Sequence, residues 1–373
     1  MDLSLNAEDL RFRSEVREFL KTHLPARIAR RQRQGFPVSG TGWTPLQKFI
    51  YEVEYGLADA PDISVPGIHL VGPVICRFGS DWLKQKFLTP LLSGELYFAQ
   101  GFSEPQAGSD LANLKTRAVR DGDDYVVSGQ KIWTSEAHHS DYVFALVRTD
   151  PAPKPQAGLS MMLIDLKAPG VTVRPIVTID DCHHVNEVFF DEVRVPVAHR
   201  IGEENKAWTY AKFLLDSERT YNAHIGRLLR HLRRIRELAA LQERSAGTPV
   251  AGEAFRLKLA RLDIDIKALE WSVLRVLLAD PDGAGLGAAA SALKVRGSDL
   301  LMRVSEMELD VLGPHALPRF ERTDAESDNA LPSGASHDAP GLMAQYFYWR
   351  ASTIFGGSND IQRSIIWNSI YRN

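Results

Sequence analysis

Apolar residues recur at helical spacing from residue 7 to about residue 96. Val16 and Phe19 are three residues apart, and Phe49, Val53 and Leu57 follow one another every four residues. These intervals place apolar side chains on one face of a helix. The first quarter of the chain is therefore predicted to be helical.

The pattern changes between about residues 98 and 197, where short runs rich in Val, Ile, Phe, Tyr and Thr are separated by Asp-Gly and Pro-Gly pairs. Such runs are typical of β-strands joined by turns. The sequence DGDD at 121–124 predicts a hairpin turn. NEVFFDEVRVP predicts a later strand that ends at Pro196, because proline cannot donate to the next strand.

Helical spacing returns at Lys206 and predicts one long helix. Its apolar face would contain Phe213, Leu214, Ile225, Leu228, Leu229, Leu232, Ile235 and Leu238. Further helices are predicted near 255–278 and 288–312, and the last ones at about 342–370. A loop rich in Ser, Asp, Pro and Gly, at 323–341, precedes the last helices.

This order of elements predicts an α+β fold in three parts. The parts are an N-terminal helical domain (1–97), a middle antiparallel β domain (98–203) and a C-terminal four-helix bundle (204–373). The sequence has no Gly-x-Gly-x-x-Gly motif opening a βαβ unit. A Rossmann-type dinucleotide site is therefore not expected.

Charge and composition exclude several classes of partner. The net charge is −3 and the pI about 6.4, so no overall basic field would attract nucleic acid or an anionic membrane. The basic run at 227–237 alternates with apolar positions and is interpreted as a solvated helix face. The first twenty residues contain no secretory or membrane-spanning apolar run, which predicts a cytoplasmic protein.

Cysteine and histidine offer candidate reactive or metal-binding side chains. Cys76 and Cys182 form no Cys-x-x-Cys pair and are predicted to be buried thiols in a reducing compartment. His183 and His184 are adjacent on a predicted strand, so their side chains should point to opposite faces. No Cys or Asp partner at ligand spacing is recognised, and no metal is expected.

Two motifs carry the most specific signal: QGFSEPQAGSDLANL at 100–114 and GQKIWTS at 129–135. Ala107, Gly108 and Ser109 are small enough for a ligand to approach the backbone. Trp133 offers a flat apolar face, with hydroxyls on the next two residues. In sequence, order and separation, both motifs resemble the flavin signatures of the acyl-CoA dehydrogenases. The resemblance continues through NEVFFDEVRVP and GGSNDIQR, from about residue 73 to 370.

The resemblance implies an FAD-dependent enzyme that oxidises an acyl-CoA to the trans-2-enoyl-CoA and passes electrons to an electron-transferring flavoprotein. It implies that the following residues bind the flavin: Gln100, Phe102, Ser103, Gly108, Ser109, Trp133, Thr134, Ser135, Ser358, Asn359 and Asp360. Ser109, Arg219 and Gly357 would lie at the substrate.

The resemblance also raises the question of the catalytic base. Many members of the family carry a glutamate in the C-terminal segment, where this chain has Gly356. Others carry it on the long helix one residue before an arginine, and Ser-Glu-Arg at 217–219 is similar to that arrangement. The resemblance therefore implies Glu218 as the base. Its neighbours at i−4 and i+4, Leu214 and Asn222, offer no helical salt bridge that would explain the carboxylate otherwise.

Two departures from the family pattern affect partners and substrate. The Arg-x-Phe-Gly element that binds the flavin diphosphate across a subunit interface is missing from 241–255. A related second subunit, as in the two-subunit dehydrogenases of steroid side chains, dicarboxylic or other bulky acyl-CoAs, would supply the charge, and a homo-oligomer is the alternative. Between ARRQRQGFPVSG and TGWTPLQ the chain also lacks another helix and a Trp-Pro connector that the family normally has, which affects the wall around the acyl tail and so the size of the substrate. Competing interpretations are a flavin oxidase or monooxygenase, or a non-catalytic subunit that completes a flavin site.

Overall fold

The computed structural model describes residues 7–23, 44–58, 60, 65–218, 223–246, 252–279, 287–316 and 339–371. The N-terminal helices are α1 (Ala7–His23), α3 (Pro45–Leu57), η1 (Pro66–Val71), α4 (Gly72–Phe78), α5 (Asp81–Leu83), η2 (Lys84–Leu88) and α6 (Thr89–Leu92). Thr44 starts α3 with a reciprocal cap, because its hydroxyl accepts from the amide of Gln47 and the Gln47 side chain accepts from the amide of Thr44.

Eight strands form one sheet in the middle of the chain. They are β1 (Phe98–Gly101), β2 (Arg117–Asp121), β3 (Asp124–Ser135), β4 (Tyr142–Arg148), β5 (Leu159–Asp165), β6 (Val171–Val177), β7 (His183–Pro196) and β8 (Arg200–Ile201). The order is β6-β7-β3-β2-β4-β5-β8, with β1 on β4. Most pairs are antiparallel, as expected, but β1 and β2 each run parallel to β4, so the sheet is mixed. The predicted hairpin at 121–124 and the strand ending at Pro196 are confirmed.

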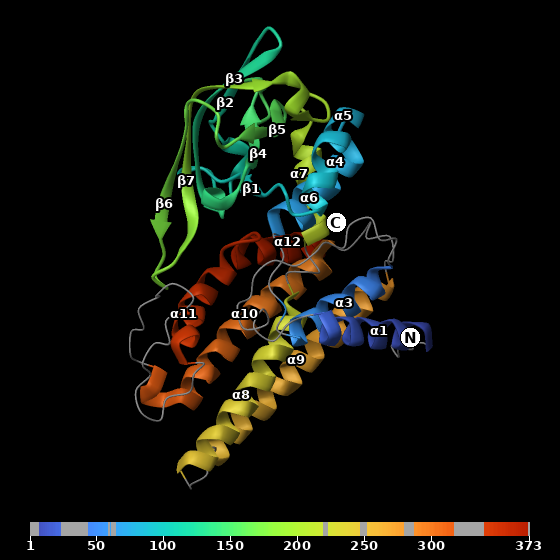
Figure 1. Cartoon of the computed structure of the whole chain (residues 1–373), viewed down its shortest axis with the longest axis vertical. Coiled ribbons are helices and arrows are strands. Elements are labelled where there is room, and N and C mark those ends of the chain that lie inside the picture. Colours follow the sequence, from blue (N-terminus) through green and yellow to red (C-terminus); the bar gives the residue numbers. More distant parts are fainter. Residues whose placement is uncertain are drawn as a thin grey trace.

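Both faces of the central strands are buried. Along β4, Phe144 and Leu146 face a core shared with α4, α6 and α7 (Ala207–Glu218), whereas Val143, Ala145 and Val147 face a second core beneath β7. Figure 1 shows the sheet with α4, α5, α6 and α7 along one side, and α1, α3 and the C-terminal helices below it. The strands therefore form a compact body that can hold their connecting loops rigidly.

The C-terminal helices below the sheet are α8 (Ile225–Ala246), α9 (Glu253–Ala279), α10 (Gly287–Leu312), α11 (Ala339–Arg350) and α12 (Asn359–Tyr371). They form a bundle, against which α3 packs with Phe49 and Val53 (Figure 1). The α+β class with helical ends is confirmed. The domain boundaries at 97 and 203 stay a prediction.

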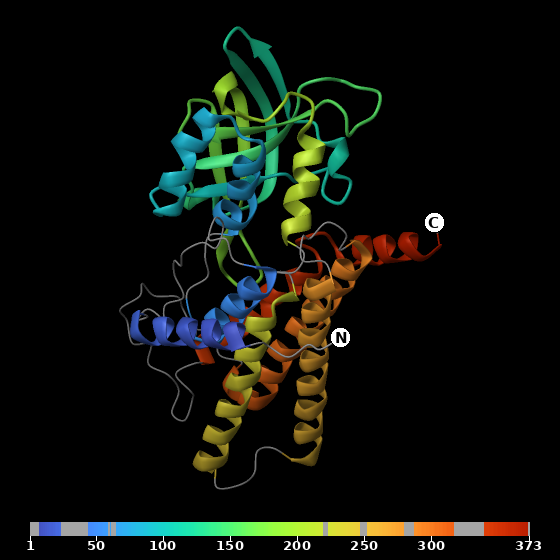
Figure 2. The ribbon, with the colours of Figure 1, turned by 90° about the vertical axis from the view of Figure 1, so that its right-hand side faces the viewer.

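The single long helix predicted from residue 206 is wrong. The region contains two separate helices, α7 and α8. His224, directly before α8, has a left-handed φ of 54°. The apolar residues continue at helical spacing but enter different cores. Leu214 packs with the sheet, whereas Leu228 and Leu232 pack in the bundle. In Figure 2, α7 runs from the β domain toward the bundle.

Candidate functional site

The loop after β1 is held against strand β3. Ser103 O accepts from Ile132 N at 3.0 Å, and the backbones of Glu104 and Ala107 bond to each other in a tight turn. Phe102 is buried and packs edge-to-face with Phe144, so its side chain is not free to meet a ligand. A Cβ placed on Gly108 would meet nothing within 4 Å, and Ser109 is exposed. This end of the loop leaves open space beside small residues.

A buried ion pair ties this loop to β3. Lys131 Nζ donates to Glu104 Oε1 at 2.7 Å and to the carbonyl of Phe102 at 3.2 Å. Glu104 also accepts from the amides of Lys115 and Thr116. Burial alone would raise the pKa of Glu104, but the Lys131 charge and these hydrogen bonds lower it to about 2. Burial lowers the pKa of Lys131 to about 8, so at neutral pH both groups are charged.

Trp133 lies at an irregularity of β3, where the pairing with β7 shifts register between Lys131 and Thr134. Its φ is 59°, unusual for a large aromatic residue, and its side chain is 57% exposed. Trp133 is therefore not an ordinary core tryptophan. Thr134 is fully buried, and its hydroxyl has no hydrogen-bond partner in the described part of the chain. An exposed aromatic face beside an unsatisfied hydroxyl fits the rim and edge of a flavin ring.

Histidines surround the β7 side of this irregularity. Asn186, fully buried, donates from Nδ2 to the carbonyl of Thr134 at 3.0 Å and accepts from His183 Nε2 at 2.6 Å. The ring of His138 stacks on that of His183 with centroids 3.7 Å apart. Burial, and secondarily the neighbouring rings of His139 and His183, lowers the pKa of His138 to about 4. His138 is therefore a neutral neighbour of the site at physiological pH.

Beyond these rings, the expectation that His183 and His184 lack Asp or Cys neighbours is wrong for His184. Its Nε2 lies 2.7 Å from Asp180 Oδ2, and its ligand atoms lie within 4.8 Å of those of Asp180 and Cys182. The other oxygen of Asp180 accepts from Thr178, so the carboxylate is already engaged by protein. The absence of a metal stays a prediction. Of the two cysteines, Cys182 is buried as expected, but Cys76 is exposed.

The C-terminal segment begins with two left-handed glycines, Gly356 (φ 65°) and Gly357 (φ 80°). A Cβ on Gly357 would lie 2.6 Å from the Gln362 amide. Ser358 caps α12 by accepting from Ile361 N at 3.3 Å, and the Asp360 side chain is exposed. Asn359 instead points into the bundle, where its Oδ1 accepts from Lys294 at 2.9 Å. A flavin role for Asn359 would thus fall to its backbone.

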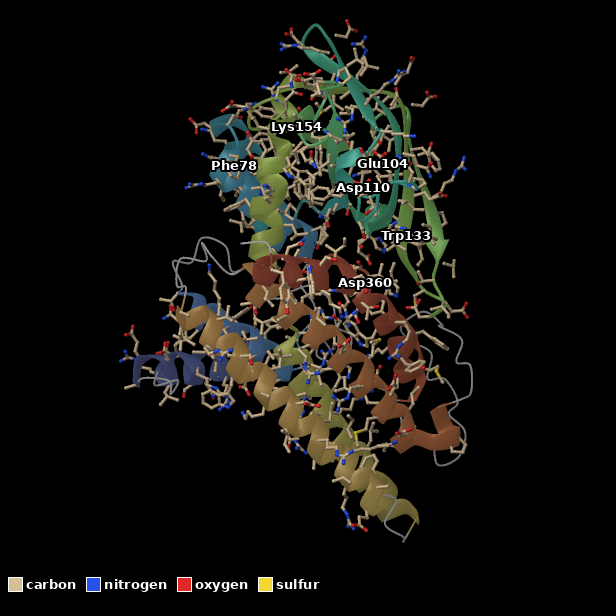
Figure 3. The ribbon with its side chains drawn as sticks, turned by 180° about the vertical axis from the view of Figure 1, so that it is seen from behind. Phe78, Glu104, Asp110, Trp133, Lys154 and Asp360 are labelled. Atoms are coloured by element: carbon tan, nitrogen blue, oxygen red, sulfur yellow. The ribbon has the colours of Figure 1, made fainter. Side chains whose placement is uncertain are left out.

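The structure brings the loop, Trp133 and the start of α12 to one region. In Figure 3, Asp110 and Trp133 lie at the end of the β domain that faces the bundle, and Asp360 lies at the facing end of the bundle. The rings of His184 on β7 and Tyr348 on α11 are 5.0 Å apart, which joins the two bodies directly. Gln100 lies on β1, directly before this loop, and pairs with Phe144 on β4. The predicted cofactor residues therefore converge from three separate segments.

Two of the predicted site residues, Glu218 and Arg219, cannot be placed relative to the site. Glu218 is the last residue of α7, but its side chain lies outside the described residues, as does all of Arg219. Three residues of the site were missed by sequence reasoning: Glu104, Lys131 and Asn186. All three stand inside the motifs that drew attention, and a charged residue predicted to lie within a buried strand was the available signal for Lys131.

Comparison with known proteins identifies the family of the chain. Residues 99–193 match the acyl-CoA dehydrogenase middle domain, and residues 205–371 match the acyl-CoA dehydrogenase C-terminal domain. The acyl-CoA dehydrogenase FadE29 of Mycobacterium tuberculosis is 34% identical over 332 residues, which are 88% of this chain and 81% of the relative.

Solved structures show the same similarity over the whole length. The ChsE4-ChsE5 complex from Mycobacterium tuberculosis gives a TM-score of 0.83 at 32% identity, covering 100% of this chain and 99% of that one. The Tcur3481-Tcur3483 steroid ACAD gives 0.84 at 28% identity, with coverage of 100% and 99%. In the described residues, no helix combines the length and apolarity needed to cross a membrane.

The matches cover nearly the whole chain, and the site presents small residues, an exposed tryptophan and an unsatisfied hydroxyl where a flavin would bind. The chain belongs to the acyl-CoA dehydrogenase family, the FAD-dependent enzymes that introduce a double bond beside the thioester of an acyl-CoA.

Proposed function

We propose that Glu218 is the base of this acyl-CoA dehydrogenase. Its carboxylate would take the proton from the α-carbon of the acyl group, and the electron pair of that C–H bond would form the new double bond as hydride leaves the β-carbon. FAD, when bound, supplies the hydride acceptor at N5. The acyl-CoA would lose one proton to Glu218 and one hydride to the flavin, so the products are trans-2-enoyl-CoA, protonated Glu218 and reduced flavin, and atoms and charges balance.

The position of α7 supports this assignment. The helix packs against η1, α4 and β5 at the sheet and runs toward the bundle, with Glu218 as its last residue (Figure 2). The other family position for the base, Gly356, has φ 65°, a conformation that a glutamate would adopt only with strain. The backbone at 356 is thus shaped for glycine, which favours a base from another segment.

The exposed ring of Trp133 is the observation that best supports the cofactor assignment. We assign its exposed face to the flavin ring and the hydroxyls of Thr134 and Ser135 to the polar edge of the ring. Gly108 and Ser109 would receive a phosphate or ring oxygen through backbone N–H groups. Ser358, Asp360 and the backbone of Asn359 would approach from α12.

Substrate contacts follow from the same arrangement. Ser109, Gly357 and Arg219 are assigned to the acyl-CoA, with Gly357 allowing close approach because it carries no side chain. The Tcur3481-Tcur3483 relative is described as a steroid ACAD, which supports a bulky acyl group here, such as a steroid side chain or a dicarboxylic acyl chain. An electron-transferring flavoprotein is the proposed electron acceptor.

A related second subunit is the proposed partner. This chain lacks Arg-x-Phe-Gly at 241–255, so the negative charge of the flavin diphosphate needs donors from elsewhere. ChsE4-ChsE5 was solved as a complex of two proteins, which supports an assembly of unlike chains here.

Anaerobic reduction of the bound flavin tests the proposal. Adding a bulky acyl-CoA should bleach the visible flavin band without any nicotinamide, because the substrate itself supplies the hydride. A requirement for nicotinamide, or the lack of flavin under every condition, would contradict it. Reoxidation in air distinguishes the alternative, since a flavin oxidase reoxidises rapidly and a dehydrogenase slowly.

A further inference from the structure

Trp133 needs external support to keep its backbone conformation. A φ of 59° is costly for a residue with a large side chain, and such conformations persist only where surrounding contacts enforce them. The exposed indole makes few contacts of its own, since 57% of the residue is accessible. The enforcing contacts must therefore come from the residues on either side of it.

On the N-terminal side, the support is Lys131. Its side chain is fully buried and its ammonium group bonds Glu104 Oε1 at 2.7 Å and the carbonyl of Phe102 at 3.2 Å. One residue later, Ile132 N donates to Ser103 O at 3.0 Å. The backbone that enters Trp133 is thus bound to the loop that carries Gly108 and Ser109. The loop after β1 and the strand that carries Trp133 are therefore bonded to each other.

On the C-terminal side, the support is Asn186. Its Nδ2 donates to Thr134 O at 3.0 Å and lies 3.2 Å from His138 Nδ1, while its Oδ1 accepts from His183. These contacts leave one consistent amide orientation, because Nδ2 must donate to the carbonyl. They fix the peptide plane that follows Trp133.

We infer that Lys131 and Asn186 are positioning residues that hold Trp133 in its left-handed conformation, so that its indole presents one face to the flavin. The inference rests on the proposed role of Trp133 at the cofactor. A buried ion pair often stabilises a protein no better than apolar residues of the same size would. The Lys131–Glu104 pair instead holds the loop after β1 and strand β3 together at the proposed flavin site. Neither residue touches the reacting atoms in this scheme.

The experiment measures FAD affinity of the apoprotein, in the assembly in which the chain holds flavin. Asn186→Leu keeps the side-chain size but removes the donor to Thr134. Lys131→Met is made together with Glu104→Gln, so that no buried charge is left unpaired. Each change should weaken FAD binding roughly tenfold, about the effect of losing one well-placed hydrogen bond.

Tyr125→Phe is the matched control. Tyr125 lies on β3, as Trp133 does, and the substitution removes its hydroxyl, which donates to Glu204 at 2.8 Å. It should lower the melting temperature as much as Asn186→Leu does while leaving FAD affinity within twofold of wild type. Equal effects of both variants on FAD affinity would show that Asn186 acts only on general stability, and would overturn the inference.

Trp133→Ala closes the test. If Asn186 acts through Trp133, Asn186→Leu should weaken binding little further in the Trp133→Ala background. A full tenfold effect of Asn186→Leu in the Trp133→Ala background would overturn the inference and leave the proposed role of Trp133 at the flavin in place. Unchanged FAD affinity in Trp133→Ala by itself would instead remove the proposed role of Trp133, and the inference with it.

Discussion

At the scale of single residues, the backbone of Gly356 bears on the proposed position of the base. Its φ of 65° belongs to the left-handed region, which glycine enters at little cost and glutamate does not. Gln362 Nε2 donates to the carbonyl of Gly356 at 3.3 Å, and a Cβ on the neighbouring Gly357 would lie 2.6 Å from that same nitrogen. This backbone supports the proposal that the base comes from another segment, with Glu218 as the candidate.

Replacing Glu218 by Gln should slow flavin reduction by the acyl-CoA ~10²-fold or more, since a positioned general base contributes that much. The amide is nearly the same size, so FAD and acyl-CoA binding should be retained. Single-turnover stopped-flow reduction measures the effect. Glu203→Gln, which neutralises an exposed carboxylate just before α7, is the control and should react at the wild-type rate. A rate within a few-fold of wild type for Glu218→Gln would place the base elsewhere.

Introducing Gly356→Glu into a Glu218→Ala background should restore little activity. The strained backbone at 356 would misplace the new carboxylate, and a displacement of ~1 Å can cost ~10²-fold in rate. The same reduction assay measures the outcome. Recovery to near the wild-type rate would mean that the segment relaxes readily and that the left-handed backbone does not limit the base.

At the scale of elements, the contact between α3 and α8 depends on two glycines. A Cβ on Gly56 would lie 2.6 Å from the carbonyl carbon of Gly226, and one on Gly226 would lie 2.5 Å from the carbonyl oxygen of Glu52. Backbone atoms cannot rotate away as a side chain can. The close crossing brings the N-terminal helix into the bundle core through Phe49 and Val53.

Gly226→Ala should therefore destabilise the protein by about 1–3 kcal/mol, the usual range for overpacking. Chemical denaturation of the purified protein measures the change. Gly341→Ala is the matched control, because this exposed helical position has nothing within 4 Å of an added Cβ. It should be neutral or stabilising by about 0.4–1 kcal/mol, since alanine restricts the unfolded chain. Equal destabilisation by both variants would show that the crossing is not tightly packed.

At the scale of the whole molecule, two half-buried histidines link stability to pH. Burial lowers the pKa of His69 to about 4 and of His224 to about 3, from an ordinary value of 6.5. Between pH 6.5 and 4 the unfolded chain binds more protons than the folded protein, so stability should fall as pH falls. Glu52 opposes this, because burial raises its pKa to about 7 and the folded state then binds the extra proton.

The melting temperature should therefore fall between pH 7 and pH 5, with each histidine contributing about 1–2 kcal/mol at pH 5. His69→Gln should make the decrease shallower. Glu52→Gln should make it steeper, because the opposing carboxyl is gone. A profile that is flat in wild type and unchanged in both variants would contradict the assignment of these groups.

Assembly is the second property at this scale. The flavin-bearing protein should contain a second, different chain, because the Arg-x-Phe-Gly element that neutralises the flavin diphosphate is missing from 241–255. Native mass analysis of the complex purified with its flavin measures its composition. A fully active homodimer with one FAD per chain would refute the prediction, and the yellow colour of the chain expressed alone would already argue against it.

The sequence alone determined the local elements and the family. Periodicity separated the helical ends from the strand region because apolar spacing reports which face of an element is buried. The hairpin at 121–124 and the strand end at Pro196 followed from turn chemistry and from a missing donor. The flavin motifs were recognised because their residue types and order are unusual, independent of any packing.

Only the tertiary structure decided how these parts act together. Helical spacing continues from Leu214 to Leu228, and it was packing against two different cores that divided this region into α7 and α8. Spacing along the chain could not show that Asn359 faces Lys294 or that Lys131 meets Glu104 across 27 residues. The exposed, left-handed Trp133 is likewise a property of the paired strands, because a register shift arises only when β3 lies against β7.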